Sequence, residues 1–312
     1  MRKNLFILTA VVSAVIFCGC SKDNSNDSGG QLSITTNVKP STDGSFTKSP
    51  ISSFSSSTIG VFVSGAAYSP TANSTAAVSS GSNTVSPIPS IYINADATVY
   101  GYYPATASEL TNPTSVSTKT VSVVTADDFS ATSQNDYLWA TPVAVSKTNR
   151  TAALTFNHAL SKVIFSLKLG STYAGAGALT EIKLTAGGDT YKFKAGTNGT
   201  MAIATGALAG LTSQSTLDYT GTKTLSTTAS EIVALVAPTQ LAEGTSSSST
   251  ITLAITLDGQ TYSATLPVSQ VAAWVAATSY TYNITVSSGE LVIGTVSIAD
   301  WTAGTSTDVT LS

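Results

Sequence analysis

Apolar and polar residues alternate along most of this chain, and this period of two is what a β-strand with one buried face produces. The first alternating run covers residues 31–39, where Leu32, Ile34, Thr36 and Val38 share one face. The pattern therefore predicts an all-β fold built from many short strands. Further alternating runs lie at residues 58–65, 97–105, 119–124, 135–145, 150–170, 180–188, 230–238, 251–267, 279–286, 290–301 and 307–312.

The longest run, residues 150–170, changes face partway along its length. Leu154, Phe156 and His158 lie on one face, whereas the apolar positions after Ser161–Lys162 have the opposite parity. A single odd step of this kind is typical of a β-bulge. The run therefore predicts either a bulge or a corner between two sheets at Ser161–Lys162.

Two dipeptides indicate turns, and one segment is helix-like. Asp258–Gly259 separates two alternating runs and has the composition that a type I′ hairpin turn prefers. Asn198–Gly199 predicts a second turn, between strands over residues 189–196 and 199–206. Residues 269–277 form the one short helix candidate.

The chain length and the many short strands together predict two β-rich domains. A chain of 312 residues is long enough for about two domains. Short strands separated by hydroxyl-rich turns are typical of β-sandwiches and barrels. A shift in composition near residues 145–150 places the boundary at about Asn149. The predicted domains are residues 31–148 and 149–312.

Residues 1–19 have the pattern of a secretory signal peptide. Arg2–Lys3 is basic, and Leu5–Phe17 is apolar but shorter than the span of about 20 residues that a bilayer requires. Gly19 then precedes Cys20 at the end of the apolar stretch. A small residue before cysteine at this point resembles the lipobox of bacterial lipoproteins, which implies signal cleavage between Gly19 and Cys20.

Cys18 and Cys20 are the only cysteines, and two other roles for them are disfavoured. A disulfide across one intervening residue would be strained, and a thiolate metal site lacks further soft ligands because the chain has a single histidine. We therefore expect lipidation of Cys20, with two or three acyl chains anchoring the protein firmly to a membrane. The polar residues 20–30 are expected to form a flexible tether.

The low content of charged residues argues against nucleic acid as a binding partner. Charged residues make up only 10% of the chain, well below the usual ~25%, and the net charge is −3. Without a basic patch, nucleic-acid binding is not expected. Abundant threonine and serine with few charges fit an exported β-protein whose surface is hydroxylic rather than ionic.

The residues that could form a catalytic or binding site are better explained by structural roles than by catalysis. His158, the single histidine, lies on an apolar face, so a packed structural role is expected. Asp127–Asp128 is interpreted as a loop pair. Trp139, Trp274 and Trp301 either pack in cores or stack on sugars. The sequence contains no phosphate-binding loop, zinc spacing or nucleophile elbow, so we expect no catalytic residue, metal ligand or cofactor, and no enzyme activity.

Several motifs together resemble the fimbrillin family, the pilins of type V pili in Gram-negative anaerobes. The resemblance covers nearly the whole chain after the signal, in the expected order, and is carried by the lipobox, TIGVFVSG, VYGYYP, NDYLWA, LTFNHALSKVIFSL, SYTYNITV and VSIADW.

The resemblance implies two tandem transthyretin-like β-sandwich domains and a pilus subunit made as an outer-membrane lipoprotein. It also implies that a trypsin-like protease removes the first strand and the lipid, after which a neighbouring pilin subunit inserts a strand. The family usually has arginine at the cleavage site, whereas the candidate bond here is Lys48–Ser49, with Pro50 following. Val309 and Leu311 are the candidate donor-strand positions.

Two hypotheses of different classes remain open at this point. The first is a structural or accessory pilus subunit that supports adhesion and biofilm, in a shaft, tip or anchor position. The alternative is a glycan-binding surface lipoprotein that holds sugars through its tryptophans. The location of the tryptophans, in a core or on a surface, separates the two.

Overall fold

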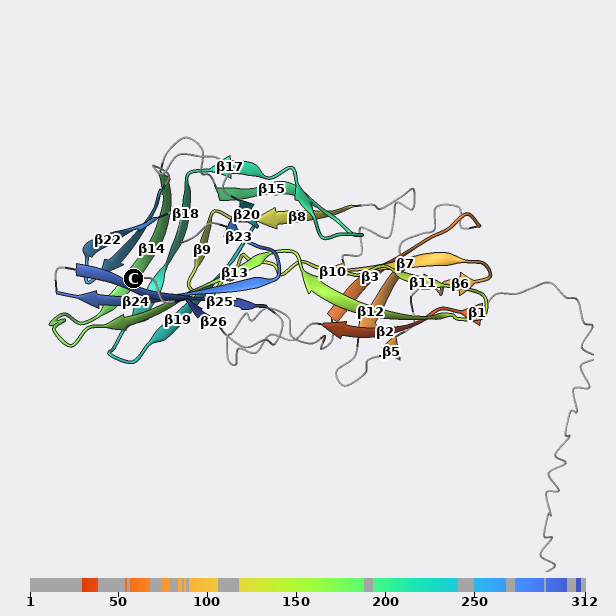
Figure 1. Cartoon of the computed structure of the whole chain (residues 1–312), viewed down its shortest axis with the longest axis horizontal. Coiled ribbons are helices and arrows are strands. Elements are labelled where there is room, and N and C mark those ends of the chain that lie inside the picture. Colours follow the sequence, from red (N-terminus) through yellow and green to blue (C-terminus); the bar gives the residue numbers. More distant parts are fainter. Residues whose placement is uncertain are drawn as a thin grey trace, which may run out of the picture.

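Every regular element that the structure describes is a β-strand, which confirms the predicted all-β fold. The protein is elongated, with an eight-stranded sheet toward one end and two five-stranded sheets at the other (Figure 1). The computed structural model describes residues 30–38, 54, 57–67, 74–78, 84–85, 87, 90–105, 118–187, 193–240, 250–267, 273–288, 290–301 and 307–309.

The eight-stranded sheet has the order β4-β3-β7-β10-β12-β2-β5, with β11 also paired to β7. The first long strand, β2, therefore lies inside this sheet, parallel to β12 on one side and antiparallel to β5 on the other. The strands are β2 (Ser33–Val38), β3 (Ser57–Ser64), β4 (Ser74–Val78), β5 (Thr84–Val85), β7 (Ala97–Tyr103), β10 (Leu138–Ala140), β11 (Val143–Val145) and β12 (Thr151–His158). A small ladder of β1 (Gly30–Gln31) and β6 (Tyr92–Ile93) adjoins it.

Two five-stranded sheets build the other end, in the orders β19-β13-β24-β25-β26 and β22-β21-β14-β18-β9. The first contains β13 (Ser161–Leu169), β19 (Ser230–Val236), β24 (Thr278–Ser287), β25 (Glu290–Asp300) and β26 (Thr307–Val309). The second contains β9 (Ala126–Asp128), β14 (Ala178–Gly187), β18 (Thr216–Thr224), β21 (Thr250–Leu257) and β22 (Gln260–Pro267). Smaller ladders comprise β8 (Thr118–Val123), β15 (Phe193–Ala202), β16 (Leu208–Ala209) and β17 (Thr212–Gln214), and β20 (Thr239–Gln240) with β23 (Ala273–Trp274).

Three groups of buried side chains form the core. One packs on the eight-stranded sheet, and a second lies between the five-stranded sheets. The third, which we call the junction core, joins strands from both ends of the molecule. It consists of Tyr102, Val121, Val123, Tyr137, Ala159, Leu160, Ala195, Met201, Ile203, Leu235, Ala237 and Trp301.

The chain passes between the two ends more than once. β12 pairs with β2 and β10, whereas β13 begins at Ser161 and pairs with β19 and β24. The predicted corner is therefore confirmed within a few residues of Ser161–Lys162. Strand pairing does not follow the predicted boundary at Asn149, because β12 lies after it in the first sheet while β8 and β9 lie before it and pair with β15 and β18. That residues 31–148 and 149–312 form two domains stays a prediction.

Of the two predicted turns one is confirmed and one is wrong, and the predicted helix is wrong as well. Asp258 and Gly259 have φ values of 51° and 77° and join β21 to β22, as a type I′ turn requires. Asn198–Gly199 is not a turn, because β15 runs through it and absorbs the extra residues as a register shift against β8. The helix expected at 269–277 is also wrong over its described part, where Ala273–Trp274 forms β23.

Candidate functional site

The first strand is buried along one complete face. Leu32 and Ile34 are 0% exposed, Val38 is 4% and Thr36 is 6%, as the alternation predicted. Their intervening neighbours on β2 are half-buried or exposed. The apolar face of β2 therefore completes the core of the eight-stranded sheet rather than covering its surface.

Arg150 holds the beginning of this strand, a role that no motif in the sequence indicated. Its carbonyl oxygen accepts a hydrogen bond from the Ser33 amide at 3.0 Å, and its Nε donates to the Ile93 carbonyl at 3.3 Å. Its side chain lies so close to Gly30 that a Cβ at that position would be 2.6 Å from Nη1. Arg150 thus ties β12, the start of β2 and the strand β6 together.

The residues predicted for lipidation and cleavage lie outside the described residues. These are Cys20, the Gly19–Cys20 bond and the Lys48–Ser49 bond, and they stay predictions. Of the candidate donor positions, Leu311 is also outside, whereas Val309 belongs to β26 and pairs with Val296 on β25. β26 lies at the edge of its sheet.

His158 is a packed residue at the junction, as its apolar neighbours predicted. It is 1% exposed, and its Nδ1 lies 3.0 Å from Asp136. Its ring stacks on Trp301 with a centroid distance of 3.9 Å and an interplanar angle of 4°. The Trp301 amide in turn donates to the Ala277 carbonyl at 2.8 Å. This stack fastens the end of β25 to the end of β12.

The three tryptophans differ in exposure. Trp274 and Trp301 are each 2% exposed, and the Trp274 Nε1 donates to the Tyr282 hydroxyl at 3.0 Å. Burial raises the pKa of Tyr282 above its ordinary value, so the hydroxyl that accepts this hydrogen bond from Trp274 stays protonated. Trp139 is only partly buried and packs against the junction core. Of the three, only Trp139 presents surface to a ligand.

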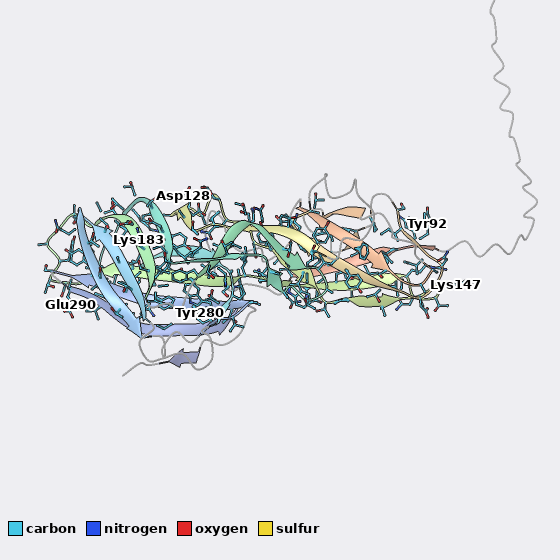
Figure 2. The ribbon with its side chains drawn as sticks, turned by 90° about the horizontal axis from the view of Figure 1, so that it is seen from above. Tyr92, Asp128, Lys147, Lys183, Tyr280 and Glu290 are labelled. Atoms are coloured by element: carbon cyan, nitrogen blue, oxygen red, sulfur yellow. The ribbon has the colours of Figure 1, made fainter. Side chains whose placement is uncertain are left out.

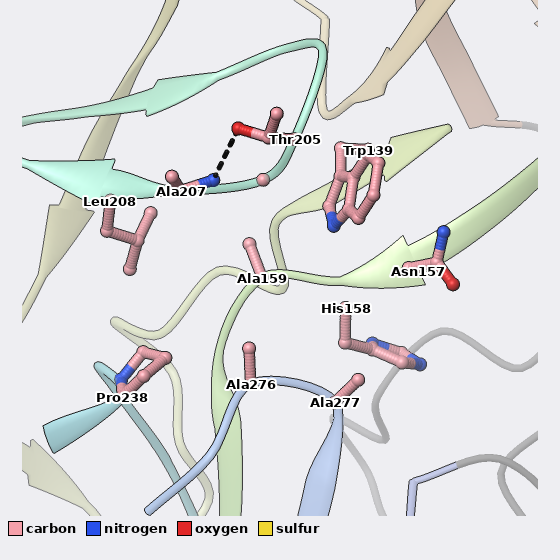
Figure 3. A pocket seen from close by; sticks show the side chains of 11 residues that line it. Trp139, Asn157, His158, Ala159, Thr205, Ala207, Leu208, Pro238, Ala276 and Ala277 are labelled. Carbon is pink, nitrogen blue, oxygen red and sulfur yellow. Dashed lines mark hydrogen bonds between the residues drawn. The ribbon is translucent and has the colours of Figure 1, made fainter. Parts of the chain in front are cut away.

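A pocket of about 380 Å³ opens beside Trp139 at the junction. The ends of β10 and β12 form one wall, the turn between β15 and β16 a second, and the segment Ala276–Ala277 before β24 a third (Figure 3). Leu208 and Pro238 add apolar surface. Because these elements are far apart in the sequence, no local motif could have indicated the pocket.

The acidic pair Asp127–Asp128 stabilises the loop that follows it. Asp128 Oδ1 accepts from the amides of Ser130 and Thr132 at 2.8 and 3.2 Å, and Asp127 Oδ1 accepts from the Ser133 amide at 3.1 Å. The interpretation of the two residues as a loop pair is wrong, because both belong to β9 and pair with β18, although their carboxylates accept hydrogen bonds from the loop that follows. Among the described residues, no three His, Cys, Asp or Glu side chains gather as a metal site. In the same residues no helix has the length and apolarity to cross a membrane.

Asp258 is a further acidic residue with several hydrogen-bond partners. The sequence pattern identified it only as part of a turn. Its carboxylate accepts from the amides of Ala178 and Gly177 at 2.8 and 2.9 Å and from the Tyr173 hydroxyl at 2.7 Å. These hydrogen bonds, led by the Ala178 amide, lower the pKa of Asp258. Asp258 therefore fastens the β21–β22 hairpin to the start of β14.

The all-β fold agrees with a match to a protein family. The family described as fimbrillin-like matches residues 36–301, which is most of the chain. The chain therefore belongs to the fimbrillin-like family. Among curated proteins no match is found.

Solved structures with the same fold come from Bacteroides species. A proposed cell adhesion protein of Bacteroides uniformis is 20% identical, with a TM-score of 0.62 over 87% of this chain and 99% of that chain. One from Bacteroides ovatus is 17% identical, with a TM-score of 0.61 over 89% of this chain and 99% of that chain. At these identities the likeness establishes a shared fold. The family is described as fimbrillin-like, and the two solved structures are named as proposed cell adhesion proteins.

Proposed function

We propose that this chain is a structural or accessory subunit of a cell-surface pilus, made as an outer-membrane lipoprotein and assembled by strand exchange after proteolysis. In this role it supports adhesion and biofilm formation. Membership of the fimbrillin-like family supports the general assignment to a surface appendage. The proposal adds the lipid anchor, the protease and the exchange mechanism.

The observation that carries the proposal is the position of β2 between β12 and β5. Burying a large aliphatic side chain contributes about 1.5–3 kcal/mol. Leu32, Ile34 and Val38 together therefore contribute roughly 5–9 kcal/mol, an upper estimate. A precursor with β2 in place would be a closed, stable subunit.

Cleavage at Lys48–Ser49 would separate β2 from the rest of the chain while leaving its neighbours in place. Loss of β2 would leave the β12 ladder unpaired on that side and open the core beneath it. An unpaired edge of this kind accepts an extended strand through main-chain hydrogen bonds and side-chain pockets. In this proposal, a strand from a neighbouring pilin subunit fills the place of β2.

Two substitutions test the proposal in cells. Cys20→Ser should abolish labelling by radioactive palmitate, because the acylated thiol is lost; continued labelling would overturn the lipid anchor. Lys48→Ala should slow maturation by a trypsin-like protease and leave the fold intact, because it removes only the basic side chain that such a protease recognises. Maturation of Lys48→Ala at the normal rate would exclude this bond as the cleavage site.

A further inference from the structure

The pocket at the junction has the size and location of a small-molecule site. Its volume of about 380 Å³ lies in the range of roughly 300–1,000 Å³ for ligand pockets, which form preferentially where domains or sheets meet. No lining residue belongs to β2 or to β26. Removal or exchange of either strand would therefore leave every lining residue in the subunit.

Trp139 forms the aromatic wall of this pocket. Its indole points toward the space between the β15–β16 turn and the end of β12 (Figure 3). Gly206 makes this placement possible, because a Cβ there would lie 2.1 Å from the Trp139 Nε1. With a φ of 71°, Gly206 also has a backbone conformation that residues with side chains rarely adopt. The turn is thus shaped around the indole.

The polar groups at the pocket are neutral. Thr205 is exposed on the turn, and its hydroxyl oxygen accepts from the Ala207 amide at 3.4 Å, which leaves the hydroxyl proton available to a ligand. Asn157 pairs with Trp139 across β12 and β10 and lines the pocket; its Nδ2 already donates to the Thr141 hydroxyl and the Thr155 carbonyl at 3.4 Å each, so its side-chain oxygen is the group it offers as an acceptor. Among the described residues that line the pocket there is no Asp, Glu, Lys or Arg, and His158 is already stacked on Trp301.

We propose that this pocket binds a neutral saccharide residue, which stacks on Trp139 and donates or accepts hydrogen bonds at Thr205 and Asn157. A pyranose ring presents an apolar C–H face beside a rim of hydroxyls, which matches an indole face bordered by hydroxyl and amide groups. The absence of charge in the lining disfavours acidic sugars and phosphates, whose desolvation would be uncompensated. The inference concerns adhesion by the folded subunit and does not depend on lipidation, cleavage or strand exchange.

Saturation-transfer NMR with the purified chain tests this binding. The probes are the methyl glycosides of glucose, galactose, mannose, fucose and N-acetylglucosamine, with N-acetylneuraminic acid and glucose 6-phosphate as charged comparisons. We expect saturable binding of at least one neutral probe, with a Kd in the millimolar range of about 1 mM. No saturable binding by any neutral probe, or equal binding of the charged ones, would overturn the proposal.

Variants locate the site. Trp139→Ala should weaken binding about tenfold or more, as loss of a central aromatic contact does. Trp139→Phe keeps a core aromatic and should weaken binding less, and Thr205→Val changes an exposed turn without disturbing the core. Tyr92→Ala is the matched control, because Tyr92 is a 59% exposed aromatic at the far end of the molecule (Figure 2). If Trp139→Phe and Thr205→Val melt normally and bind as the unchanged protein does, the sugar lies elsewhere and the proposal is wrong.

Discussion

The strand β2 should stabilise the eight-stranded sheet through its buried face, and Ile34→Ala is the sharpest perturbation of that face. Ile34 is 0% exposed and lies beside Ala152 of β12 and Val85 of β5. Truncation removes three carbon atoms and leaves a cavity between two neighbouring strands. Thr35→Ala is the matched control, because Thr35 points to the opposite face and is only half-buried.

The expected cost follows from the complete burial of Ile34. Ile→Ala at a fully buried site costs about 2–5 kcal/mol, whereas substitutions away from the core cost about 0.5 kcal/mol. Since 1.4 kcal/mol is a factor of ten, the opening equilibrium around β2 should shift roughly 30-fold to 4,000-fold.

Native-state hydrogen exchange followed by mass spectrometry measures this shift locally. Peptides from β12 should exchange faster in Ile34→Ala by the factor above, because amide protection tracks the local opening free energy. Peptides from β21, in a sheet at the other end of the molecule, serve as an internal reference. Equal protection of β12 in Ile34→Ala, Thr35→Ala and the unchanged protein would refute the argument that β2 closes this core.

Three further predictions concern other parts of the fold. Asp258→Asn should lower the melting temperature at neutral pH. Hydrogen bonding lowers the pKa of Asp258, so the stability that its carboxylate contributes is present above the unfolded pKa of about 3.9 and is lost as pH falls through the folded pKa. The difference in melting temperature between the two proteins should therefore shrink in melts taken toward pH 2. Gly206→Ala should lower the free energy of unfolding, measured in urea, by about 1–3 kcal/mol, because the added Cβ meets Trp139. Gly259 has a similar positive φ but nothing within 4 Å of an added Cβ, so Gly259→Ala should lower it by about 1 kcal/mol. Equal losses would show that the Trp139 contact does not matter. Deletion of Thr307–Ser312 should leave a folded, lipidated monomer that forms no SDS-resistant ladder after trypsin treatment, and ladders equal to those of the full chain would place the donor strand elsewhere.

Local alternation was enough to predict many of the strands and several buried faces, but it missed β4 and β5 in the segment read as a loop and β16, β17 and β18. The buried face of residues 32–38, which include β2, was visible because Leu32, Ile34 and Val38 repeat at the period of a strand, and burial then follows from their apolar character. The Asp258–Gly259 turn was predictable because both residues tolerate the positive φ that the turn needs.

The features that the sequence could not reveal are those that depend on contacts between segments far apart in the chain. The parallel contact of β2 with β12 joins residues more than a hundred positions apart, so composition near Asn149 gave no sign that β12 belongs to the first sheet. The Asn198–Gly199 signal was overridden by tertiary structure, because β15 continues past it along β8. The pocket beside Trp139 likewise required five separate segments to meet.

The central claim is that the assembled subunit has lost its first strand, and the N-terminal residue of the chain recovered from pili tests it most directly. Mass spectrometry of the N-terminal peptide, after pili are sheared from intact cells, gives this residue without labelling or mutation. The account predicts a chain that begins at Ser49 and contains no peptide from residues 30–38. A polymerised chain that still begins at an acylated Cys20 would contradict it.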